Sequence, residues 1–147
     1  MTRPVYLLAI LAALMWLLPG TAAAQDQWEQ QVRTMLRESA KQFEDEGYEL
    51  THRIFTGSLN DDEGENVTLE LEIGTEYYIV GACDTDCSDL DLTLYDAGGN
   101  QVDIDTLMDD FPIVEVTPSR SGTYNVRVYM ASCSVEPCRY GLGSFGR

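Results

Sequence analysis

The segment 83–96 constrains the fold of this chain more than any other feature. It reads CDTDCSDLDLTLYD, an acidic turn between two cysteines followed by three leucines that alternate with polar residues: Leu90, Leu92 and Leu94. Successive side chains of a β-strand point to opposite faces, so this period of two is typical of a strand with one buried face. The segment predicts a short loop that leads into a half-buried strand.

From Tyr48 onward the same kind of pattern recurs. The expected strands are Thr51–Ser58, Asn66–Ile73, Glu76–Cys83, Asp89–Asp96, Gln101–Thr106, Ile113–Thr117, Thr123–Met130 and Arg139–Phe145. Clusters of Gly, Asn, Asp, Pro and Ser separate them about every 10 residues. Short strands with such regular punctuation predict an all-β domain over residues 48–147, a two-sheet antiparallel β-sandwich of jelly-roll type.

Residues 25–47 have the period of a helix instead. Apolar and small side chains recur at steps of three and four: Trp28, Val32, Met35, Leu36, Ser39 and Phe43. Asp26 and Glu29 resemble a capping box, and Gly47 is a natural helix end. We expect one amphipathic α-helix before the sandwich, with this stripe packed on it. A helix that binds a partner or dimerises stays open as the alternative.

Residues 1–24 predict a secretory signal peptide. Arg3 precedes an apolar run over 5–18, and Ala22-Ala23-Ala24 provides small residues for cleavage. The run is shorter than the roughly 20 residues that span a bilayer. We therefore expect a periplasmic or secreted protein with no membrane insertion after cleavage.

The four cysteines form two closely spaced pairs, C-x3-C and C-x4-C. In an exported protein such pairs predict disulfides rather than a zinc site. Local bonds, Cys83–Cys87 and Cys133–Cys138, are favoured, and the crossed connectivities stay open.

The net charge of −16 excludes nucleic acid as a partner, because DNA and RNA binding needs basic surface. No catalytic group stands out either. The single histidine, His52, lies at the start of an expected strand, and no serine lies in a G-x-S-x-G turn. The sequence indicates a protein that is not an enzyme.

Calcium is the cofactor to consider, since it binds six to eight oxygen ligands from acidic loops. The candidate ligands are Asp84, Asp86, Asp89 and Asp91 around the cysteine turn, with Asp61 and Asp62 of an earlier acidic turn as further candidates. Neither turn has the spacing of an EF-hand. The alternative interpretation is that these carboxylates cap turn amides and lie in solvent.

A contact patch is expected on one outward strand face. If Tyr124, Val126 and Val128 face inward, then Asn125 and Tyr129 face outward, and Tyr95 shares the outward face of its own strand. Aromatic rings with polar neighbours are suited to protein or glycan contact.

The order of several short motifs resembles the bacterial pre-peptidase C-terminal domain. The motifs are GSL at 57–59, VTLEL at 67–71, GxxYxI at 74–79, DLDLxLYDxxG at 89–99, SGTYxVxV at 121–128 and YG at 140–141. The resemblance covers about residues 53–145 and implies a β-sandwich appended to secreted peptidases for targeting, solubility or substrate binding. Some relatives hold calcium and bind collagen.

The chain departs from that family in three places. This sequence contains no peptidase domain, an expected helix stands in place of the acidic N-terminal segment that completes the collagenase calcium site, and the first loop closes with Asn66-Val67. Collagen binding is therefore not expected. The sequence predicts a non-catalytic exported module that recognises a protein or glycan. The alternative is a structural protein that oligomerises through its N-terminal helix.

Overall fold

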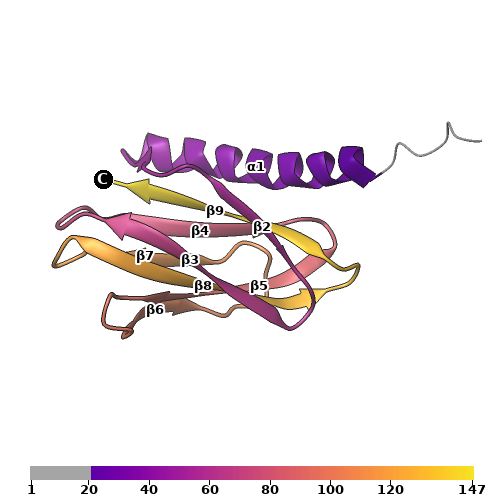
Figure 1. Cartoon of the computed structure of the whole chain (residues 1–147). Helices are drawn as coiled ribbons and strands as arrows, with labels where there is room; N and C mark the ends of the chain where they lie inside the picture. Colours follow the sequence, from indigo (N-terminus) through magenta and orange to yellow (C-terminus); the bar gives the residue numbers. More distant parts are fainter. Residues whose placement is uncertain (1–20) are drawn as a thin grey trace, which may run out of the picture.

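The computed structural model describes residues 21–147 and arranges them in three layers, one helix over two sheets (Figure 1). The helix is α1, Thr21–Asp45. The strands are β1 (Glu49–Leu50), β2 (Phe55–Leu59), β3 (Glu63–Leu71), β4 (Tyr77–Cys83), β5 (Cys87–Tyr95), β6 (Gln101–Asp105), β7 (Ile113–Val116), β8 (Gly122–Cys133) and β9 (Cys138–Gly146). Most of the predicted signal peptide, residues 1–20, lies outside the described residues.

The strands form two antiparallel sheets, which confirms the predicted sandwich. One sheet has the order β1-β9-β4-β7, with β2 also paired to β9, and the other has the order β3-β8-β5-β6. When β2 is taken as the first strand, this alternation between sheets is that of a jelly roll. The core between the sheets contains the alternating side chains that the sequence indicated, among them Leu90, Leu92 and Leu94.

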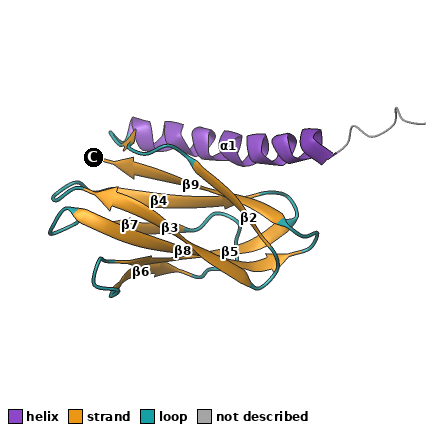
Figure 2. Cartoon of the chain, in the orientation of Figure 1, coloured by secondary structure: helices purple, strands orange, loops and turns teal. Residues whose placement is uncertain are grey.

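The helix covers one outer face of the sandwich. Figure 2 shows α1 lying along the sheet that contains β9 and β4. Val32 and Leu36 are fully buried there, against a cluster that includes Val80 and Phe145. The ring of Phe43 stacks on Phe145 with 4.7 Å between centroids. The stripe predicted from the sequence therefore packs on the chain's own sheet.

The end of α1 is fixed by a local motif. The N–H of Tyr48 donates to the carbonyl of Phe43, the N–H of Gly47 donates to that of Glu44, and Gly47 has a φ of 87°. These two bonds and the left-handed residue make a Schellman motif, which satisfies helix carbonyls that would otherwise lack partners. The chain then reverses directly into β1.

The first expected strand, Thr51–Ser58, is interrupted. Two residues of β1 and five of β2 pair with β9; between them the N–H of Thr51 still donates to the carbonyl of Ser144, and residues 52–54 leave the ladder. The guanidinium of Arg33 on α1 accounts for part of this break, because it donates to the carbonyl of Ile54 and to Oγ1 of Thr56. Contact with the helix takes the place of strand pairing at this point.

Candidate functional site

The outer face of the β3-β8-β5-β6 sheet is a regular surface that α1 leaves uncovered. Tyr95, Asn125 and Tyr129, the predicted contact residues, all lie on it. Tyr95 is opposite Asn125 in the β5–β8 register, and Asp91 is opposite Tyr129. Their neighbours Leu94, Val126 and Val128 point into the core, as alternation requires. The three contact residues are half-buried and reach solvent.

Hydrogen bonds and a cation hold these side chains in place. Tyr129 donates its hydroxyl to Oδ1 of Asp62 at 2.9 Å, and this bond raises the pKa of the phenol. The guanidinium of Arg127 lies 5.9 Å from the centroid of the Tyr129 ring. Thr68 on β3 donates to Oδ1 of Asn125 at 3.0 Å. The face is therefore preorganised, and Arg127 is a member of it that the sequence analysis missed.

Asp84 lies in the turn between the first two cysteines and is occupied by backbone donors. Its Oδ2 accepts from the N–H of Arg139 at 2.7 Å and its Oδ1 from that of Asp86 at 3.3 Å. Burial raises its pKa, and these two bonds oppose that shift. Asp84 thus acts as a buried turn cap. Asp86 contributes its backbone carbonyl to the N–H and hydroxyl of Ser134.

The second acidic turn has similar local roles. Oδ1 of Asp61 accepts from the N–H of Cys133 at 2.7 Å, and Asp62 accepts from Tyr129. Within the described residues, no group of three or more acidic, histidine or cysteine side chains is placed to hold a metal ion. The six predicted carboxylates do not form one coordination site, and calcium binding at either turn stays a prediction.

Asp89 and Asp91 belong to a different group of carboxylates. Burial is the largest cause that raises the pKa of each; Asp109 adds to the shift of Asp89, and Asp89 and Asp105 add to that of Asp91. Oδ1 of Asp89 is buried and has no hydrogen-bond partner among the described residues. Ionising these two groups therefore costs free energy in the folded state.

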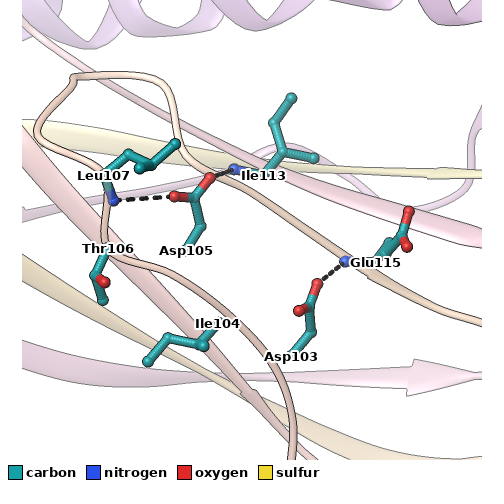
Figure 3. Close-up of a pocket in the computed structure, with 7 residues that line it drawn as sticks. All are labelled: Asp103, Ile104, Asp105, Thr106, Leu107, Ile113 and Glu115. Carbon is teal, nitrogen blue, oxygen red and sulfur yellow. Dashed lines mark hydrogen bonds between the residues drawn. The ribbon is translucent and has the colours of Figure 1, made fainter.

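The edge between the sheets is closed by two further carboxylates. β7 is an edge strand, and its N–H groups at Ile113 and Glu115 do not pair with β4. Asp105 accepts from the first at 2.9 Å and Asp103 from the second at 2.7 Å, across a shallow hollow of about 400 Å³ (Figure 3). Side chains here replace a neighbouring strand, which protects the edge from pairing with another chain.

The two cysteine pairs are bonded as favoured, Cys83 with Cys87 and Cys133 with Cys138, each with a Cα–Cα distance of 5.9 Å. Cys87 and Cys133 are also direct partners in the β5–β8 register, so the bridges lie side by side at one end of the sandwich. Disulfides persist mainly in oxidising compartments outside the cytosol.

The single histidine is engaged locally. Nδ1 of His52 lies 2.9 Å from Oγ1 of Thr51, and Nε2 lies 3.0 Å from the carbonyl oxygen of Glu70. Both ring nitrogens thus have partners in the loop and on β3. No helix in the described part of the chain has the length and apolar character needed to cross a membrane.

No protein-family model and no curated protein matches the sequence. One solved structure that is similar is the pre-peptidase C-terminal domain of collagenase from Bacillus anthracis. The two share 14% identity and a TM-score of 0.48, over 62% of this chain and 86% of that one. The fold follows from the strand order of this chain itself, and membership of that family stays a prediction.

Proposed function

We propose that this protein is a non-catalytic exported binding module, and that the outer face of the β3-β8-β5-β6 sheet is its contact surface. One observation carries the proposal. The helix covers the outer face of one sheet, whereas the other face is left open and presents half-buried tyrosines, an asparagine and an arginine. Tyr and Arg are enriched where proteins make tight contacts, since they combine large contact area with hydrogen bonding.

The shape of this face favours an extended ligand. Tyr129 lies four residues from Asn125 along β8, which corresponds to about 13 Å at the usual rise of a strand. Tyr95 is next to Asn125, so the two rings mark the ends of a strip with Arg127 and Thr93 between them. A peptide segment or a short glycan of similar length would contact both rings at once.

Export is supported by the two disulfides together with the apolar N-terminal segment of the sequence. The periplasm and the extracellular space both fit this chemistry. The alternative function, assembly through the apolar stripe of the helix, is not favoured by any observation, because Val32 and Leu36 are buried against the chain's own sheet.

Binding to defined probes tests the proposal. The mature protein is applied to immobilised peptidoglycan, to other envelope glycans and to a set of extended peptides, and retention is quantified. We expect retention on one class of probe, and we expect Tyr95→Ala with Tyr129→Ala to weaken it at least about tenfold, the loss of roughly 1.4 kcal/mol.

The control is Ile73→Ala, which changes an exposed apolar residue at a turn away from this face. Melting temperatures establish that each variant is folded. Unchanged retention in the double tyrosine variant would refute this contact surface, and turnover of a bound probe would refute the non-catalytic function.

A further inference from the structure

A cationic groove lies between α1 and the segment that joins β1 to β2. Three of the nine Lys and Arg residues of this acidic chain line it, Arg33, Arg37 and Arg53. The other lining residues are Thr56 and three largely apolar ones: Leu50, Ile54 and Phe55. The groove has a volume of about 550 Å³, which is within the range of ligand pockets, roughly 300 to 1,000 Å³.

The arginines of this groove differ in whether they form ion pairs and hydrogen bonds within the chain. Arg33 forms an ion pair with Glu29 at 2.8 Å and holds the Ile54 carbonyl. Arg37 and Arg53 are exposed, and neither forms an ion pair or a hydrogen bond with a side chain or carbonyl of the described residues. The groove therefore presents two unpaired guanidinium groups beside apolar side chains, a combination suited to an acidic segment with an apolar residue.

The chain itself contains such a segment in the loop between β6 and β7. Leu107 is 67% exposed and Met108 is 88% exposed, and Asp109 and Asp110 follow them directly. Large apolar side chains that are this exposed and adjacent often mark interaction surfaces.

Hydrogen bonds fix the shape of this loop. The N–H of Leu107 donates to Oδ1 of Asp105, as Figure 3 shows, and that of Asp109 donates to the carbonyl of Leu107. The N–H of Phe111 donates to Oδ1 of Asp109. Ordering these residues before contact lowers the entropy cost of binding.

The groove and the loop lie at opposite edges of one sheet. The groove adjoins β1 and β2, which flank β9 on one side, and the loop leads into β7, the strand at the other edge. A chain therefore cannot place its own loop in its own groove. We propose that copies of this chain associate head to tail, with the 106–110 loop of one copy bound in the cationic groove of the next.

The chemistry of the two surfaces is complementary. Leu107 and Met108 would contact the apolar side chains of the groove, and Asp110 would lie near Arg37 and Arg53. Charge complementarity at close range sets the pairing and the register of such an interface. The interface is heterologous, because the loop of one copy contacts the groove of another. Association therefore extends into a ring or a chain of copies rather than a closed two-fold dimer.

Sedimentation velocity on the purified exported protein, over a concentration series, tests this arrangement. The groove variant is Arg37→Glu with Arg53→Glu, and the loop variant is Leu107→Ser with Met108→Ser; neither removes a side-chain hydrogen bond seen in the structure. We expect the wild type to form species larger than a monomer, and each variant to weaken association at least tenfold.

Mixing the two variants gives the decisive result. The groove variant retains an intact loop and the loop variant retains an intact groove, so an equimolar mixture forms one two-copy complex that cannot grow further. Arg120→Glu with Arg139→Glu is the control of equal charge change, away from the groove and from the contact face, and it leaves association unaltered.

A wild type that is monomeric at about 1 mM, the range of very weak complexes, would overturn the proposal. If such a monomer binds an acidic peptide in the groove, the occupant is a foreign partner and not a second copy. Monomers in the mixture, or a groove variant that still associates, would also overturn it.

Discussion

Gly141 on β9 is a position where side chains of α1 lie directly against the sheet backbone. A Cβ atom added there would lie 2.7 Å from Cγ1 of Val32 and 2.9 Å from Cδ1 of Leu36, with the carbonyl oxygen of Phe55 at 3.1 Å. Both helix side chains are fully buried. We therefore predict that Gly141→Ala forces the helix away from the sheet and destabilises the protein.

Two opposing effects determine the size of this change. Adding a methyl group to a well-packed core costs about 1–3 kcal/mol. Replacing a strand glycine by alanine returns roughly 0.5–1 kcal/mol, because the unfolded chain loses freedom. Overpacking is the larger effect, since two buried side-chain atoms would lie under 3.0 Å from the new Cβ and the backbone oxygen of Phe55, at 3.1 Å, limits how far it can move away. The net loss is about 1–1.5 kcal/mol, a fall of roughly 5 °C in melting temperature for a domain of this size.

The assay is thermal unfolding followed by circular dichroism, with a double-mutant cycle. Val32→Ala removes the methyl group that the new Cβ would meet, so the pair Gly141→Ala with Val32→Ala is expected to lose at least about 0.5 kcal/mol less than the two single changes together. The comparison variant is Gly143→Ala, whose Cβ would have the ring of Phe145 at 3.0 and 3.2 Å and Leu36 at 3.7 Å as its nearest neighbours, so the crowding against the helix is smaller there. A Gly141→Ala variant with a melting temperature equal to or above that of the wild type, or strict additivity in the cycle, would refute this account of how α1 packs on β9.

Three further predictions follow from the charges and the layers. Burial raises the folded-state pKa of Asp89, so the protonated carboxyl contributes to stability below the ordinary aspartate pKa, and that contribution is lost as the pH rises through the raised value. Asp89→Asn should therefore have a higher melting temperature than the wild type at neutral pH. A higher melting temperature of the variant that persists at pH 3 would contradict this titration. Calcium at tenfold its dissociation constant would stabilise by about 1.4 kcal/mol, so a melt in calcium against EDTA tests the predicted cofactor, and equal melting temperatures would leave the acidic turns as turn caps. A chain that begins at Tyr48 should unfold cooperatively, because both disulfides and the inter-sheet core lie within it. Its melting temperature should be lower, and the apolar surface that α1 normally covers should bind a hydrophobic dye. A chain that stays unfolded would show that α1 is essential to the core.

The contact face was predictable in part because it depends on alternation along single strands. Asn125 and Tyr129 lie on the face opposite to Val126 and Val128, whatever strand pairs with β8. That Tyr95 would join them required the β5–β8 pairing, which brings together residues 30 positions apart in the sequence. The cationic groove was not predictable at all. Arg53 meets Arg33 and Arg37 only because β1 and β2 run back beneath the helix.

The acidic residues show where local information ends. Their density suggested ligands for one ion, but two of the turn carboxylates accept from backbone donors, Asp84 from the N–H of Arg139 and Asp61 from that of Cys133. These donors lie 55 and 72 residues away in the chain. A sequence gives the number of carboxylates, whereas their partners depend on which loops the fold places together.

The sequence by itself indicated the strands, the turns between them and the helix with its apolar stripe, and it favoured the two local disulfides, because each of these follows from neighbours within a few residues. Tertiary structure decided the rest: the jelly-roll pairing of β2 with β9, the seat of α1 on Gly141, and the edges at which the groove and the 106–110 loop lie. Those features depend on contacts between segments far apart in the chain. Such contacts form only when the two sheets close over a shared core, and no local pattern of residues specifies them.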